Sequence, residues 1–125
     1  MSRRRPCAGA AFALALALAA AGAGAQQVEN APGAVLRGLD KVASQTRDIE
    51  LATGETVAFG SLSLTLDECR YPAGDPAANA YAHLRIRDQR SGVVIFDGWM
   101  IASSPALSAL DHPRYDVWVL RCSSA

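Results

Sequence analysis

Apolar and polar residues alternate along most of the chain after residue 33, and this period of two predicts short β-strands. The clearest run is 61–66, where Leu62, Leu64 and Leu66 would share one buried face. About seven strands are expected in all: 35–40, 46–51, 56–59, 61–66, 81–88, 94–101 and 115–122. Turn-forming residues at 52–55 and 89–92 separate neighbouring runs, the second as a hairpin turn.

This pattern predicts an all-β fold, a small antiparallel β-sandwich or partly open barrel. The longest loop is expected at 71–80, which holds two prolines. In the last strand, Val117 and Val119 would face one side and Trp118 the other. We therefore expect that strand to be central in its sheet and covered on both faces.

One position breaks the alternation. If the run at 61–66 continued in phase, Cys69 would lie on the outer face with Ser63 and Thr65. A buried cysteine there needs a change of phase, so the sequence predicts a β-bulge or a strand end among 67–69.

The link between the last two strands is expected to contain one short helical turn. Ser103 and Ser104 precede Pro105, and serine before proline is typical of a helix N-cap followed by the first helical position. The turn would cover 106–110 and end before Pro113, because the residue before a proline leaves the helical region.

The first 25 residues have the pattern of a secretory signal peptide. Three arginines precede an apolar run rich in alanine, and small residues at 23–25 match a cleavage site after Ala25. We expect 1–25 to be a signal peptide, 26–32 a flexible leader and 33–125 a single β domain. The apolar run is too short for a good membrane anchor, so no stable membrane insertion is expected after cleavage.

The net charge of the chain limits the classes of partner that are expected. The chain has 12 basic and 12 acidic residues, and three of the basic ones lie in the predicted signal, which leaves nine against 12. A slightly acidic domain lacks the concentrated positive face that nucleic acid or an anionic membrane surface requires. We therefore expect no nucleic-acid partner.

Two cysteines remain after the predicted signal, Cys69 and Cys122, and they favour a structural disulfide. The closed loop of about 50 residues would stabilise the domain by roughly 4 kcal/mol. The bridge is expected to join strands of similar direction across two sheets, with Trp118 on the face of the sulfur. A redox-active pair and a metal pair with His83 or His112 are the alternatives, but there is no C-x-x-C spacing, and no metal or cofactor is predicted.

The segment 98–122 holds both tryptophans and is the candidate binding region. Tryptophan, tyrosine and arginine together are typical of interaction hot spots. The candidate contact residues are Trp99, Ser103, Ser104, His112, Arg114 and Tyr115. The alternative is that Trp99 and Trp118 only fill the core, which suits Trp118 better than Trp99.

A hydrolase is the second functional hypothesis. Its nucleophile would be Ser103, Ser104 or Ser108, with His112 as the base and Asp111 or Asp116 as the orienting group. The chain has no G-x-S-x-G motif, however, and the serines before proline are explained by capping. No catalytic residue is therefore assigned.

Three segments resemble the alphaproteobacterial family called domain of unknown function 2155: LRGLDK at 36–41, ECRYP at 68–72 and the whole of 98–122. The resemblance covers roughly 33–122. It implies a small exported protein of Gram-negative bacteria, hence a periplasmic location, and a family without an assigned activity. We expect a non-catalytic binding or structural module of the cell envelope, with an envelope protein or a glycan as its partner.

Overall fold

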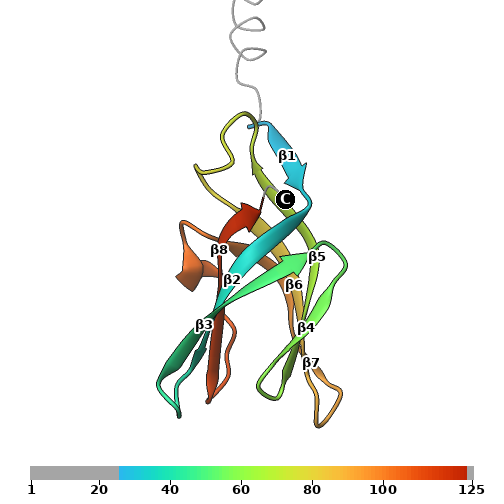
Figure 1. Ribbon diagram of the computed structural model, residues 1–125, viewed down its shortest axis with the longest axis vertical. Coiled ribbons are helices and arrows are strands. Elements are labelled where there is room, and N and C mark those ends of the chain that lie inside the picture. Colours follow the sequence, from blue (N-terminus) through green and yellow to red (C-terminus); the bar gives the residue numbers. More distant parts are fainter. Residues whose placement is uncertain (1–25, 124–125) are drawn as a thin grey trace, which may run out of the picture.

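Two antiparallel β-sheets pack against each other in the computed structural model, which describes residues 26–123 (Figure 1). The larger sheet has the order β1-β5-β6-β7, with β4 also paired to β5, and the smaller has the order β3-β2-β8. The strands are β1 (Val28–Ala31), β2 (Gly33–Asp40), β3 (Gln45–Ala52), β4 (Thr56–Phe59), β5 (Leu62–Pro72), β6 (Tyr81–Asp88), β7 (Val94–Ile101) and β8 (Tyr115–Ser123). The predicted all-β antiparallel fold is confirmed, as a sandwich of two sheets that do not close into a barrel.

The core lies between the sheets and is built from the alternating positions that the sequence indicated. Leu62, Leu64 and Leu66 of β5 are fully buried, and their neighbours on β6 face the core with them. The other sheet contributes Leu36, Leu51, Val117 and Val119. β5 and β6 therefore each have an apolar face inward and a largely polar face toward solvent.

The expected flexible leader is wrong over part of its length, because Val28–Ala31 forms β1. This strand pairs with the end of β5, and Ala31 lies opposite Cys69. Its central anchor is Glu29, whose carboxylate accepts hydrogen bonds from the Tyr71 hydroxyl at 3.1 Å and the Gly74 amide at 3.1 Å. These tertiary contacts leave no alternating pattern in the sequence. The predicted signal peptide, 1–25, lies outside the described residues.

The predicted bulge is confirmed. The register between β5 and β6 shifts between Leu66 and Glu68, so Asp67 is the extra residue and Cys69 turns into the core. Cys69 is bonded there to Cys122, with an S–S distance of 2.07 Å. The bridge links β5 of one sheet to β8 of the other, as expected.

The expectation for the last strand is wrong. β8 pairs only with β2, so it is an edge strand rather than a central one. Val117 and Val119 are buried, whereas Trp118 is only half-buried on the opposite face. The pairing of β8 with β2 has an irregularity of its own. Val35 pairs with Arg121, but the next residue, Leu36, pairs with Val119, so one residue of β8 is skipped. This bulge turns Cys122 inward. Trp118 therefore does not share a face with the sulfur.

The link before β8 contains a shorter helix than expected, a single 3-10 turn over Pro105–Leu107. Proline stands at its start as predicted, but the Ser104 side chain forms no capping hydrogen bond, because the turn closes through the backbone from the Leu107 amide to the Ser104 carbonyl. Leu110, further along, is buried and attaches the link to the core. Among residues 26–123, no helix is long and apolar enough to cross a membrane.

Candidate functional site

On the outer face of the larger sheet, aromatic and charged side chains surround Trp99. Strand register places Trp99 of β7 opposite His83 of β6, and His83 opposite Glu68 of β5. One row further along, Arg70 lies opposite Tyr81. We call this surface the Trp99 face: Val28, Glu68, Arg70, Tyr81, His83 and Trp99. Because cross-strand neighbours are about 5 Å apart, these side chains form one continuous patch.

Trp99 keeps 37% of its surface exposed, yet its ring is fixed by two neighbours. The His83 ring meets it edge-on, with centroids 5.1 Å apart and planes at 75°. The Arg70 guanidinium carbon lies 5.0 Å from the Trp99 ring centroid, a cation–π distance. Glu68 in turn accepts a 2.7 Å hydrogen bond from Arg70 Nε. An exposed indole held this way loses little conformational freedom on binding.

A small hollow adjoins the ring. Its volume is about 200 Å³, and it is lined by Val28, Arg70, Tyr81 and Trp99. Val28 belongs to β1 and is 43% exposed, so the edge strand forms one wall. The Tyr81 hydroxyl accepts a 3.4 Å hydrogen bond from Asn79. The lining combines two aromatic rings, an aliphatic side chain and a guanidinium.

An ionic cluster borders the Trp99 face. His83 Nδ1 lies 2.8 Å from Asp67, and His83 Nε2 lies 3.6 Å from Asp97. Arg85 approaches the same two carboxylates, at 3.4 Å and 3.9 Å. Three potential metal ligands thus lie within 4.8 Å of one another. The two carboxylates flank opposite ring nitrogens, however, and one ion can bind only one of those nitrogens, so the geometry fits an ion-pair cluster better than a metal centre.

This cluster, in which His83 lies between two carboxylates and beside Arg85, was not predicted from the sequence. The bulge turns Asp67 outward beside His83, and the β6–β7 register brings in Asp97. The predicted bulge is the sequence signal for the cluster, because an extra residue at position 67 can turn Asp67 to the outer face.

Three of the predicted contact residues form a structural corner at the start of β8. Tyr115 is buried, with its ring edge-on to Phe59 at 5.4 Å. His112 Nδ1 accepts hydrogen bonds from the amides of Arg114 at 3.0 Å and Tyr115 at 3.2 Å. Arg114 Nη2 donates to Asp40 at 3.0 Å. These side chains hold β8 to the β2–β3 hairpin.

The main electrostatic interaction at this corner is between the Asp40 carboxylate and Arg114. The hydrogen bond from Arg114 lowers the pKa of Asp40, and the Ala43 amide, which donates to Asp40 Oδ1 at 3.1 Å, lowers it further. The same pair raises the pKa of Arg114. Both groups are therefore charged at neutral pH and locked to each other.

None of the three predicted serines forms a hydrogen bond with His112 in the described part of the chain. Ser103 Oγ accepts a 2.9 Å hydrogen bond from Asn79, and its amide donates to the Asn79 side chain at 3.1 Å. Within 26–123, no serine hydroxyl forms a hydrogen bond with His112, whose Nδ1 already accepts two amides. The nucleophile and base of the hydrolase hypothesis are not brought together. Of the predicted contact residues, Trp99 belongs to the exposed face of the larger sheet.

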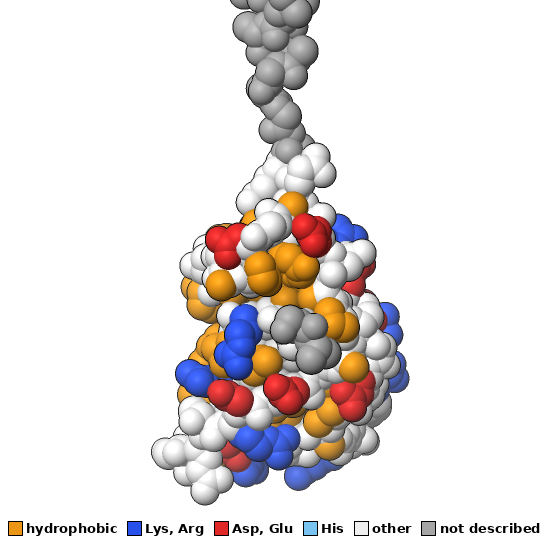
Figure 2. All heavy atoms as spheres, turned by 45° about the horizontal axis from the view of Figure 1, so that its top comes forward, with side chains coloured by type: hydrophobic (Ala, Val, Ile, Leu, Met, Phe, Trp, Pro, Cys, Tyr) orange, Lys and Arg blue, Asp and Glu red, His pale blue; other side chains and the backbone are white. Residues whose placement is uncertain are grey.

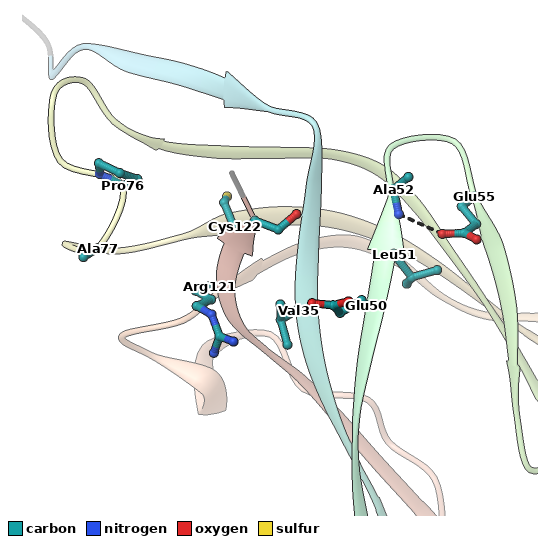
Figure 3. A pocket seen from close by; sticks show the side chains of 10 residues that line it. Val35, Glu50, Leu51, Ala52, Glu55, Pro76, Ala77, Arg121 and Cys122 are labelled. Carbon is teal, nitrogen blue, oxygen red and sulfur yellow. Dashed lines mark hydrogen bonds between the residues drawn. The ribbon is translucent and has the colours of Figure 1, made fainter. Parts of the chain in front are cut away.

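A larger hollow, with a volume of about 690 Å³, lies elsewhere. Pro76 and Ala77 of the β5–β6 loop form one side, and Val35, Glu50 and Arg121 form the other (Figure 3). Figure 2 looks toward the end of the sandwich where the described chain begins, and it shows hydrophobic side chains gathered there among acidic and basic ones. Glu50 and Arg121 flank Val35 on neighbouring strands, but no cluster of catalytic groups gathers in this hollow among the described residues.

Comparison with known proteins finds one matching family model and a distant relative. The family model described as "Uncharacterized protein conserved in bacteria (DUF2155)" matches residues 34–122, from β2 into β8, including both bridged cysteines. An uncharacterized protein of Rickettsia prowazekii (strain Madrid E) is 25% identical over 99 residues, which cover 77% of this chain and 64% of the relative. The chain thus spans less than two thirds of that relative's length. No solved structure matches.

Proposed function

The chain belongs to the bacterial family designated DUF2155, whose description assigns no activity, and we propose that it is an exported periplasmic protein and a non-catalytic binding module of the cell envelope. In this proposal, the Trp99 face is the surface that binds the partner. The observation that carries the proposal is Trp99 itself, an exposed tryptophan whose ring is held in place by Arg70 and His83.

Export is supported by the disulfide and by the pattern of residues 1–25. A bridge between Cys69 and Cys122 persists in oxidising compartments such as the periplasm and is rare in the cytosol. We expect the protein recovered from a periplasmic fraction to begin at Gln26 by N-terminal sequencing. Recovery of the intact chain from the cytosol alone would contradict export.

Binding is supported by the composition and placement of the Trp99 face. Tryptophan, tyrosine and arginine are the side chains most often responsible for binding energy at interfaces. Here Trp99, Tyr81 and Arg70 lie on adjacent strands of one rigid sheet, where they need no rearrangement to meet a partner. The charge balance is nearly even, which suits a polar partner without strong net charge.

Co-sedimentation of the purified protein with a bacterial envelope fraction tests the proposal. Trp99→Ala should reduce the bound amount by about tenfold, the loss expected for a hot-spot side chain. Leu107→Ala is the matched control, because Leu107 is an apolar residue that is 76% exposed on the 3-10 turn. Equal binding of the wild type and Trp99→Ala would overturn the assignment of this face.

A further inference from the structure

We propose that the Trp99 face binds a neutral oligosaccharide, with one sugar ring seated in the hollow beside Trp99. This inference rests on the proposed function, because it names the ligand class of the same face. Four features carry it: the flat apolar lining of the hollow, its size, the mixture of hydrogen-bonding groups around it and the near balance of charge.

The lining suits the apolar side of a sugar. A pyranose presents C–H groups on one face and hydroxyls around its edge, so it binds best where a flat apolar surface has polar groups beside it. Trp99 and Tyr81 each provide an aromatic body with a polar group, and Val28 provides an aliphatic wall. The hollow of about 200 Å³ is smaller than the roughly 300 Å³ at the lower end of drug-sized pockets, so it admits a single ring of a longer chain.

The polar neighbours suit the edge of a sugar. Each hydroxyl both donates and accepts a hydrogen bond, so a sugar site needs donors and acceptors side by side. Arg70 contacts Glu68 through both Nε and Nη2, each at 2.7 Å, which leaves its Nη1 N–H groups to donate to a ligand. Glu68 and Asp97 supply acceptors on the strands to either side of β6. Both kinds of group therefore lie around the one exposed indole.

The charge of the surface argues against an anionic ligand. Arg70 and Arg85 carry the positive charges, and three carboxylates oppose them: Asp67, Glu68 and Asp97. Each guanidinium already lies within ion-pair distance of a carboxylate, so its positive charge is compensated and a phosphate or sulfate gains little there. A polyanion requires a concentrated positive field, which is absent from this face.

The limited apolar area argues against a protein partner as the primary ligand. A stable protein interface buries roughly 1,200 Å² or more in total and has an apolar centre. The apolar part of the Trp99 face consists of Val28, Tyr81 and Trp99, and the charged Arg70 lies among them, opposite Tyr81. An apolar area of this size suits contact with a few sugar rings.

Nuclear magnetic resonance of the indole N–H groups provides a direct test. The chain has two tryptophans, so Trp118→Phe leaves Trp99 as the only indole signal and assigns it. The probes are the neutral tetramers of N-acetylglucosamine, β-linked glucose and α-linked mannose, with inorganic phosphate for comparison. We expect at least one tetramer to shift the Trp99 signal to saturation, with a Kd in the micromolar to millimolar range typical of weak ligands, about −4 to −8 kcal/mol. Phosphate should leave the signal in place.

One variant and a control locate the site. Val28→Gln alters one wall of the hollow without removing the indole, and it should weaken tetramer binding by about tenfold or more. Leu107→Ala should bind as the wild type does. The inference is overturned if no tetramer shifts Trp99, if phosphate shifts it equally, or if Val28→Gln binds without loss. Envelope binding that depends on Trp99 while every tetramer fails would reject the sugar ligand and leave the proposed function standing.

Discussion

The ring of Tyr115 occupies the space that a side chain on Gly60 would need. A Cβ at Gly60 would lie 2.6 Å from Tyr115 Cζ, closer than real Cβ contacts allow. Gly60 also has a φ of 58°, in the left-handed region that favours glycine. The next amide, that of Ser61, donates to the Tyr115 hydroxyl at 3.3 Å. The turn between β4 and β5 and the start of β8 are therefore fitted to each other across the two sheets.

Gly60→Ala should lower the free energy of unfolding by about 2 to 5 kcal/mol, because about 1–2 kcal/mol of left-handed backbone strain adds to about 1–3 kcal/mol of overpacking. Gly54→Ala is the matched control, since Gly54 also has a positive φ, 86°, but nothing lies within 4 Å of its Cβ position. Urea denaturation of both variants separates backbone strain from the clash. Equal losses would show that the fit to Tyr115 contributes nothing.

Lowering the pH should remove the stability that the Asp40–Arg114 contact contributes. Arg114 holds the pKa of Asp40 below its ordinary value of 3.8, so the unfolded chain takes up the proton first as the pH falls. This contribution is present above about pH 4 and is lost as the pH falls toward the lowered pKa of the folded state. Asp40→Asn should therefore be less stable at neutral pH and lose less stability on acidification, measured by urea denaturation at about pH 6 and about pH 3.

Asp111→Asn is the control for that measurement. Asp111 is exposed and forms no hydrogen bond or ion pair within the described part of the chain, so its loss removes one charge without a partner. A pH dependence of Asp40→Asn identical to that of the wild type would reject the Arg114 contact as its source.

The disulfide should account for a large share of stability. Cys69 and Cys122 are 53 residues apart and join the two sheets, for which loop entropy gives about 4 kcal/mol. Cys122→Ser should therefore unfold at much lower urea concentration, followed by far-UV circular dichroism. Tryptophan fluorescence is a poor reporter here, because Trp99 and Trp118 are both partly exposed in the folded protein. Two reactive thiols in the native protein would show that the bridge is not formed.

Most of the fold was predictable because apolar and polar residues alternate along β6 and along most of β5. The alternation of Leu62, Leu64 and Leu66 predicts which face of β5 is buried. A bulge at Asp67 explains why Cys69 leaves this alternation and is still buried. The strand β1 was missed because its pairing depends on backbone hydrogen bonds and on Glu29 contacts far along the chain. Such contacts leave no local period in the sequence.

The site was less predictable, because residues that are close along a chain can lie on opposite faces of the fold. Trp99 and Tyr115 belong to one compositional segment, yet Trp99 lies on the outer face of the larger sheet and Tyr115 is buried beneath the smaller. The residues that do surround Trp99 come from β5 and β6, including Arg70 and His83. Only strand register brings them together, and register is a property of the folded chain.

Trp99→Ala should leave the stability of the fold nearly unchanged, within about 1 kcal/mol, because its indole lies on the exposed face and its loss opens no cavity. Leu84→Ala, at a fully buried position on the neighbouring strand, should cost about 2–5 kcal/mol through lost burial and the cavity left behind. Thermal unfolding of both variants beside the wild type gives the comparison. A loss for Trp99→Ala as large as that for Leu84→Ala would mean that the indole serves the core, and the Trp99 face would then cease to be a candidate binding surface.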